Sequence, residues 1–171
     1  MKKIISIAFV LAASLSTLTT KAQKNDIVDI AVSSDAHTTL VAAVKAADLV
    51  TVLKSDGPFT VFAPVNDAFG KLPAGTVDNL LKAENKTTLS KILTYHVVSG
   101  NIDAAAVMSA IKKGNGSATL TTVSGGQLTA SIDNGKVKLT DENGGSAYVT
   151  ATDLIGSNGV IHVIDAVVLP K

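Results

Sequence analysis

The sequence contains no cysteine and no tryptophan, and every basic residue in it is a lysine. Without cysteine the chain has no disulfide, no thiolate nucleophile and no sulfur ligand for zinc. Without arginine it lacks the planar donor group that favours phosphate recognition, so nucleic-acid binding is not expected. Because 46% of the residues are hydrophobic and only 4% are aromatic, stability must come from an aliphatic core.

The residues that usually carry catalysis are also scarce. The three histidines, His37, His96 and His162, have no spacing that places two of them on one helix face as metal ligands, and His37 is expected to be solvated near a helix start. The sequence has no Gly-x-Ser-x-Gly elbow, no phosphate-binding loop and only two glutamates. We therefore predict no catalytic residues, no metal site and no cofactor, and a protein that is not an enzyme.

The first 22 residues have the layout of a secretory signal peptide. Lys2 and Lys3 precede an apolar run from Ile4 to Leu18, and cleavage is expected after Ala22. Residues 23–171 then form one domain with 12 lysines and 14 acidic residues, a formal charge of −2. We expect no integral membrane anchor after cleavage and a secreted chain, either extracellular or periplasmic and associated with the cell surface. The lysine-only, alanine-rich composition is typical of a bacterial protein.

The hydrophobic periodicity changes along the domain. Residues 25–53 have apolar residues at helical spacing, with Thr38 or Thr39 as a candidate cap, and helical patterns resume after a first short strand. Beyond residue 117 the period falls to two, and Asn134-Gly135 predicts a tight hairpin. The nearly continuous apolar run Val160–Val168 is expected to be a central strand. Helices followed by strands indicate an α+β fold.

The stretch Gly57–Phe69, GPFTVFAPVNDAF, combines a strand, a turn and a helix. Its first half, with Phe59 and Phe62, reads as a buried strand, which Pro64 must end because it lacks a backbone donor. Asn66 is placed to cap the helix that follows, and Asp67 suits the positive end of that helix.

This stretch, together with Ile92–Val98 (ILTYHVV) and Asn158–Pro170 (NGVIHVIDAVVLP), resembles the three signature segments of the fasciclin-like domain family, in the same order. The resemblance implies a wedge-shaped antiparallel β core with several short helices packed at one side. It also implies that the relatives of this chain are adhesion modules that are secreted or held at the cell surface. The motif residues are then structural: Phe59, Phe62, Pro64, Asn66, Asp67, Phe69, Tyr95, His96, Asn158, Gly159 and His162.

Two hypotheses concern individual residues. His96 is expected to hydrogen-bond a polar group of the first segment, with Asn66 or Asp67 as the candidates. Asp153 and Leu154 occupy the places of an aspartate and an isoleucine in an integrin-recognition motif proposed for animal members of the family, although the residues before them differ. The alternative for this pair is structural, with Asp153 bonding backbone amides of a turn and Leu154 or Ile155 filling the core.

These observations favour a non-enzymatic adhesion or extracellular-matrix module that recognises a polysaccharide or a cell-surface protein. Two alternatives stay open: a secreted carrier that binds a small ligand or cofactor in a groove between helices and sheet, and a hydrolase of surface polymers. The sequence leaves the oligomeric state open.

Overall fold

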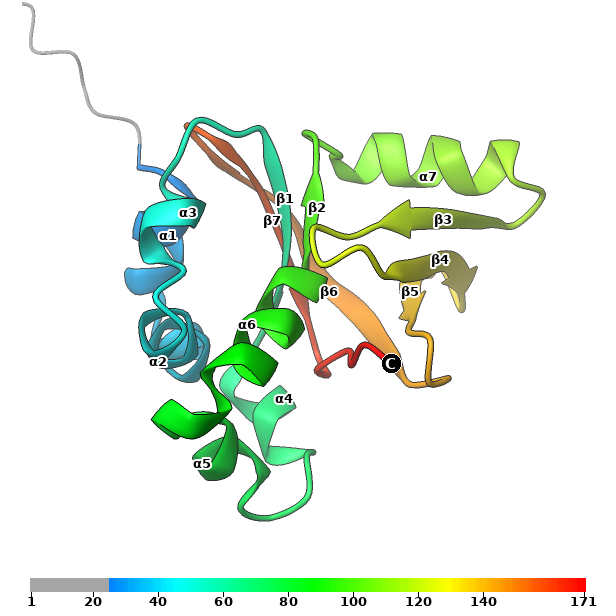
Figure 1. Cartoon of the computed structure of the whole chain (residues 1–171). Helices are drawn as coiled ribbons and strands as arrows, with labels where there is room; N and C mark the ends of the chain where they lie inside the picture. The colour runs from blue at the N-terminus through cyan, green and yellow to red at the C-terminus, as the bar shows by residue number, and fades with distance from the viewer. Residues whose placement is uncertain (1–24) are drawn as a thin grey trace, which may run out of the picture.

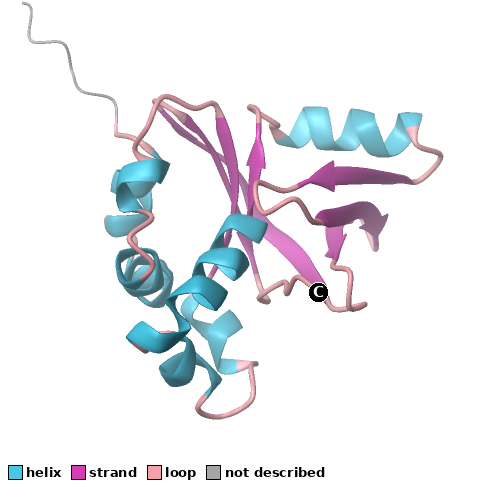
Figure 2. Cartoon of the chain, in the orientation of Figure 1, coloured by secondary structure: helices cyan, strands magenta, loops and turns pink. Residues whose placement is uncertain are grey.

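A computed structural model describes residues 25–171, and the predicted signal peptide lies outside the described residues. Helices dominate the first two thirds of the chain, interrupted by two strands, and strands dominate the last third (Figures 1 and 2). In chain order the elements are α1 (Ile27–Val32), η1 (Asp35–His37), α2 (Thr38–Ala46), α3 (Val50–Leu53), β1 (Phe59–Pro64), α4 (Asn66–Gly70), α5 (Thr76–Leu80), η2 (Ala83–Asn85), α6 (Lys86–Tyr95), β2 (Val97–Ser99), α7 (Ala104–Lys113), β3 (Ser117–Thr121), β4 (Gln127–Asp133), β5 (Lys136–Thr140), β6 (Ser146–Gly156) and β7 (Gly159–Ile164).

The seven strands form one sheet in the order β2-β1-β7-β6-β5-β4-β3. The first strand of the chain and the last lie side by side, with Phe59 opposite Gly159 and Pro64 opposite Ile164. These two strands are parallel, whereas every other pair in the sheet is antiparallel. The α+β expectation is confirmed, but the sheet is mixed and not purely antiparallel, because β7 turns back from β6 in a hairpin and inserts beside β1 in the same direction as β1.

The sheet bends far enough for its two ends to approach each other. Val98 of β2 forms an isolated bridge with Thr122, which follows β3, and the Val123 amide donates to the Val97 carbonyl at 2.7 Å. Helices α1 to α6 gather at one side of this curved sheet, as expected, while α7 lies apart from them along β3 (Figure 1). The fold is therefore close to a closed barrel with α7 placed against its β3 end.

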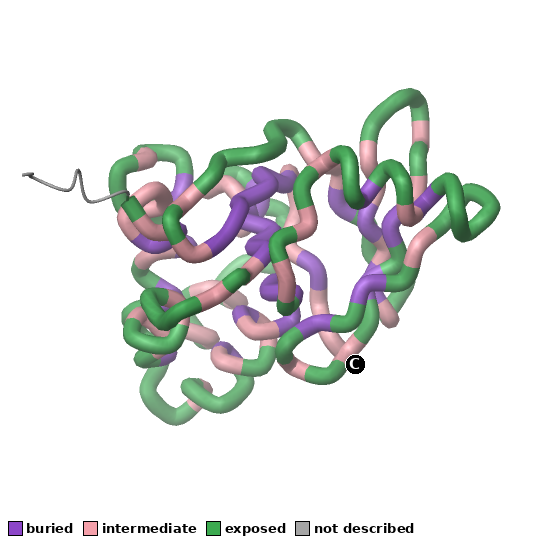
Figure 3. Tube along the Cα trace, turned by 90° about the horizontal axis from the view of Figure 1, so that it is seen from above, coloured by how far each residue is buried: buried purple, intermediate pink, exposed green. Residues whose placement is uncertain are grey.

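The buried side chains form two clusters, one on each face of the strands at the middle of the sheet. Along the chain trace, buried positions gather toward the middle of the molecule and exposed positions lie around its outside (Figure 3). In β1, Val61 and Ala63 belong to the cluster beneath the helices, while Phe62 between them belongs to the cluster enclosed by the barrel-like strands and α7. This alternation follows from the period of two along a strand. Strand β7 is buried along its whole length, as the sequence predicts for a central strand, although it ends at Ile164 and not at Val168.

Local sequence explains several element boundaries. Asp26 caps α1 through the amides of Val28 and Asp29 and completes a capping box, and Asp103 caps α7 through the Ala106 amide. Asn134 and Gly135 have φ angles of 50° and 78°, as a tight hairpin between β4 and β5 requires.

Candidate recognition site

The turn between β6 and β7 joins three elements that are distant in sequence. The Asn158 side chain accepts from the Ile27 amide at 3.0 Å and donates to the Leu53 carbonyl at 2.8 Å. It also donates to the Ser55 carbonyl at 3.0 Å, while its own carbonyl accepts from the Phe59 amide. Asn158 thus ties the start of α1 and the end of α3 to the turn, which supports the structural role expected for it.

Two glycines let the turn approach β1. A Cβ atom added at Gly159 would lie 2.2 Å from the Phe59 carbonyl oxygen, and one at Gly57 would lie 2.0 Å from the Asn158 carbonyl oxygen. Both contacts involve backbone atoms, which cannot move aside as a flexible side chain can. The sequence N-G after β6 is therefore dictated by close packing of the parallel pair.

His162, in the middle of β7, connects this strand to two neighbouring segments. Its Nε2 donates to the Ile102 carbonyl at 2.8 Å, and its Nδ1 accepts from the Asp153 amide at 3.4 Å. The imidazole stacks on the Phe62 ring with a centroid separation of 5.6 Å. These contacts support the structural interpretation of Phe62 and His162 and leave no ring nitrogen free for a metal.

Asp153 lies in an irregular part of β6. The register with β7 shifts between Ala151 and Leu154, so an extra residue bulges out, and Asp153 has a φ of 59°. Aspartate tolerates this left-handed conformation better than most residues. Its Oδ1 accepts from the Ala104 amide, at the first turn of α7, at 2.9 Å. Asp153 therefore bonds a backbone amide, as the structural alternative expects, but the amide belongs to a helix almost fifty positions earlier.

Leu154 and Ile155 do not fill the core. Leu154 is 38% exposed and Ile155 is 77% exposed, the highest exposure among the large apolar side chains that the structure describes. Strand β5 pairs with β6 only over Ser146–Tyr148, so within residues 25–171 the rest of β6 has a strand neighbour on one side only. The structure thus presents an open strand edge with apolar side chains at its end.

A polar cleft of about 350 Å³ adjoins Ile155. It is lined by Asp56, Gly57, Pro58, Asn101, Ile155, Gly156, Ser157, Asn158 and Gly159. The side chains of Asp56, Asn101 and Ser157 are exposed and belong to three different loops. Sequence reasoning missed this cleft, since nothing in the local sequence indicates that these loops meet at the Asn158 turn.

His96 does not contact Asn66 or Asp67, so the hypothesis about its partner is wrong. Its Nδ1 donates to the Ile92 carbonyl at 2.8 Å, and its Nε2 accepts from the Val168 amide at 3.2 Å. Burial lowers the pKa of His96 to about 4, against the opposing effects of the bond to Ile92 and the charge of Asp141. The neutral ring accordingly joins the end of α6 to the segment after β7.

The neighbouring motif residue Tyr95 is fully buried. Its hydroxyl donates to the Gln127 carbonyl at 2.6 Å and accepts from the Glu142 amide at 3.3 Å. Burial raises the pKa of this hydroxyl. A Cβ atom added at Gly126 would lie only 2.6 Å from Cε2 of the Tyr95 ring, so the ring packs directly against this glycine. Tyr95 thus fills space while keeping its polar end bonded, as expected.

Asn66 caps a helix, but not its own. It is the first residue of α4, and its Oδ1 accepts from the Thr39 amide at 3.0 Å and the Thr38 hydroxyl at 3.2 Å. Its Nδ2 donates to the Asp35 carbonyl at 2.8 Å. Asn66 therefore supplies the start of α2 with the cap that Thr38 and Thr39 do not provide.

The remaining residues of the first segment fit their structural interpretation. Pro64 ends β1 and is fully buried, while Phe59 and Phe69 pack against the cluster beneath the helices. Asp67 lies exposed in the first turn of α4. His37, expected to be solvated, is instead 5% exposed beside Ser34, and burial lowers its pKa.

Comparison with known proteins places this geometry in a family. The Fasciclin domain family matches residues 35–170, and the chain belongs to it. Protein sll1483 of Synechocystis sp. is 53% identical over 144 residues, which cover 84% of this chain and 73% of that protein. Immunogenic protein MPB70 of Mycobacterium bovis is 36% identical, over 78% of this chain and 63% of its own length.

More distant similarities cover small parts of larger proteins. Human periostin is 30% identical over 75% of this chain but only 14% of its own length. Among solved structures, a FAS1 domain pair from the insect cell adhesion molecule Fasciclin I matches with a TM-score of 0.54 at 21% identity. That match covers 74% of this chain and 40% of the pair, and it confirms the fasciclin fold.

Within residues 25–171 no helix has the length and apolar character needed to cross a membrane. The same residues contain no group of three or more His, Asp or Glu side chains positioned to hold a metal ion.

Proposed function

We propose that this chain is an exported, non-enzymatic adhesion module that binds an extracellular polysaccharide or a cell-surface protein through the end of β6 and the polar cleft beside it. The exposed pair Leu154 and Ile155 next to this cleft is the observation that carries the proposal. Membership of the Fasciclin domain family supports it, since a solved structure with the same fold comes from an insect cell adhesion molecule.

The surface suits an extended ligand. An open strand edge can hydrogen-bond a polymer or peptide along its length, and exposed apolar side chains beside it add contact area. In the cleft, Asp56 is the single charged lining residue, and the amide and hydroxyl of Asn101 and Ser157 can bond sugar hydroxyls or peptide groups. This combination favours a neutral or weakly charged polymer over a phosphate-rich one.

The first experiment measures binding of the labelled, purified protein to intact cells and to their isolated extracellular polysaccharide. Wild type is compared with Ile155→Ala and with Ile132→Ala, whose isoleucine is 42% exposed on β4, away from the cleft. Both changes remove the same apolar atoms from an exposed strand position. We expect saturable binding that weakens about tenfold in Ile155→Ala and is unchanged in Ile132→Ala. Equal binding by both variants would contradict this location of the site.

A second comparison separates recognition by Asp153 from its structural role. Asp153→Asn keeps an oxygen that can accept from the Ala104 amide and removes only the charge, whereas Asp153→Ala also removes the acceptor. If the carboxylate contacts the partner, Asp153→Asn loses binding at an unchanged melting temperature. If Asp153 only holds α7, Asp153→Asn binds like wild type while Asp153→Ala is less stable by about 1 kcal/mol.

A further inference from the structure

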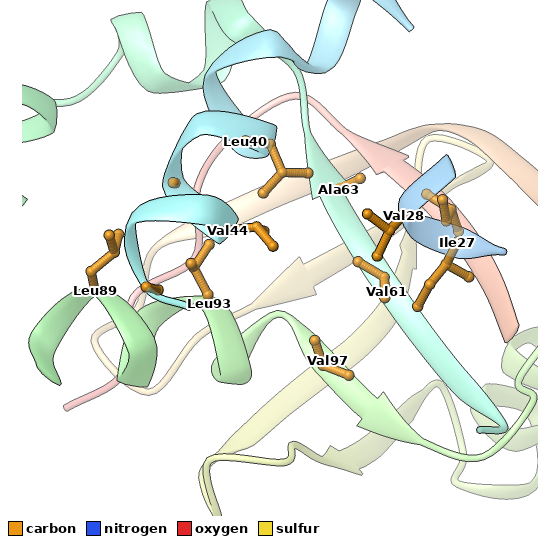
Figure 4. Close-up of a cluster of buried hydrophobic side chains, with 12 residues drawn as sticks. Ile27, Val28, Leu40, Val44, Val61, Ala63, Leu89, Leu93 and Val97 are labelled. Carbon is orange, nitrogen blue, oxygen red and sulfur yellow. The ribbon is translucent and has the colours of Figure 1, made fainter. Parts of the chain in front are cut away.

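A second hollow lies beneath the helices, between α1, α2 and α3 on one side and the sheet and α6 on the other. Its volume is about 210 Å³. In Figure 4, Leu40 and Val44 of α2 face Val28 of α1 and Val61 of β1 across this part of the core. The hollow shares no lining residue with the polar cleft beside Ile155, so the two can be tested separately.

The wall of this hollow is aliphatic. Its floor is formed by Val61 and Ala63 of β1, Val97 of β2 and Ile161 of β7, all buried. Besides aliphatic residues the lining includes Asp29, Lys45, Lys54 and His96. Both His96 ring nitrogens are already bonded, to Ile92 and Val168, so His96 offers the hollow no free polar atom.

The charged lining residues mark the mouth. Lys45 and Lys54 are exposed, and Asp29 is half-buried. Lys54 is bound by two carboxylates, Asp26 at 2.8 Å and Asp29 at 2.6 Å. Lys45 has no acidic partner within 4.0 Å among residues 25–171. The mouth therefore carries one ammonium group whose charge is not matched by a neighbouring acid, above an interior without free polar groups.

Protein interiors hold few voids larger than a water molecule, because side chains interlock at crystal-like density. An apolar cavity of about 150 Å³ stays dry and accepts a benzene molecule, so the larger hollow here has room for roughly eight to ten non-hydrogen atoms. We propose that it binds a small hydrocarbon monocarboxylate, with its apolar body among the aliphatic side chains and its carboxylate at the mouth beside Lys45. Octanoate has the size and chemistry to serve as the probe.

The test is a titration of the full chain with octanoate, followed by the methyl resonances of valine, leucine and isoleucine in NMR spectra. Val41, half-buried on α2, lines the hollow, and Val41→Phe fills part of it. Val52 on α3 is 51% exposed and is not a lining residue, so Val52→Phe adds the same ring outside. We expect saturable shifts at Val28, Val44 and Ile161 in wild type and Val52→Phe, and at least tenfold weaker binding in Val41→Phe.

The carboxylate position is tested by Lys45→Ala, which should weaken octanoate binding about threefold, the size of an exposed ion pair. Unfolding midpoints of all variants establish that they are folded before titration. The proposal is overturned if wild type shows no saturable methyl shifts, or if Val41→Phe binds octanoate as wild type does. Unchanged affinity in Lys45→Ala would overturn the placement of the carboxylate at the mouth.

Discussion

His96 links the acid stability of the protein to one buried ring. Both of its nitrogens are bonded in the neutral form, and its pKa is lowered to about 4 from an ordinary value of 6.5. As the pH falls, His96 therefore becomes protonated near pH 6.5 in the unfolded chain but only near pH 4 in the folded chain. The free energy of unfolding is therefore unaffected by His96 titration above pH 6.5 and decreases as the pH falls from 6.5 to about 4.

We predict that the free energy of unfolding decreases by roughly 3 kcal/mol between pH 6.5 and pH 4 because of His96. Urea denaturation at a series of pH values measures this decrease. In His96→Gln the side chain still donates and accepts but does not titrate, so its curve should be flatter over the same interval. The buried His37 is present in both proteins and cancels in the comparison. Parallel curves for the two proteins would contradict the prediction.

At the scale of single residues, the sequence identified the motif positions but not their partners. Tyr95, His96 and His162 were predictable as structural residues from the resemblance to the family's signature segments, and all three are buried. Their hydrogen-bond partners were not predictable, because the atoms involved are the backbone groups of Gln127, Val168 and Ile102, which any residue type could supply. Side-chain chemistry indicates that a bond is needed, and only the fold determines which backbone group provides it.

Among the elements, α2 depends on a residue outside itself. Its start is preceded by His37, which makes no capping hydrogen bond, and Asn66 of α4 accepts from the Thr39 amide instead. Asn66 was correctly expected to cap a helix, but the helix it caps is α2 and not α4. The reason is that α4 has only five residues and starts next to α2, whose free amides compete for the same oxygen.

We predict that Asn66→Ala lowers the free energy of unfolding by about 1–2 kcal/mol, as loss of a helix cap does. Hydrogen exchange should locate the effect at the first turn of α2 and not in α4. Asp67→Ala is the matched control, because Asp67 is the adjacent residue and is exposed, so its cost should stay below about 0.5 kcal/mol. Faster exchange in α4 alone would show that Asn66 caps its own helix.

The period of two in the apolar residues predicts strands β3 to β5 and the hairpin at Asn134-Gly135 well, since each strand alternates and each turn is short. The irregular part of β6 could not be foreseen in the same way. Its bulge at Asp153 comes from a register shift against β7, which depends on long-range pairing. For this reason Leu154 and Ile155, which look like core residues in sequence, are exposed.

Across the whole molecule, the sheet couples the two buried clusters. Leu89 of α6 lies in the cluster beneath the helices and Leu128 of β4 in the cluster enclosed by the strands, yet neighbouring residues of β1 belong to both. We predict that Leu89→Ala and Leu128→Ala each lower the free energy of unfolding by about 2–5 kcal/mol, with additive effects in the double variant.

All three variants should unfold in a single transition, seen at one denaturant concentration by circular dichroism and by NMR signals from both clusters. Leu89 does not line the hollow beneath the helices, so its replacement tests packing and not ligand binding. Two separate midpoints, one for each cluster, would show that the sheet does not transmit stability between them.

The parallel pairing of β1 with β7 has a consequence for biosynthesis. Phe59 of β1 pairs with Gly159 of β7, which is synthesised one hundred residues later. Until then β1 has β2 on one side and nothing on the other, and Asn158 is not there to tie α1 and α3 to the sheet. In a growing chain this edge of β1 therefore stays unpaired until Asn158 and Gly159 have left the ribosome, and a nascent chain cut short before Asn158 offers proteases and chaperones an unfinished sheet.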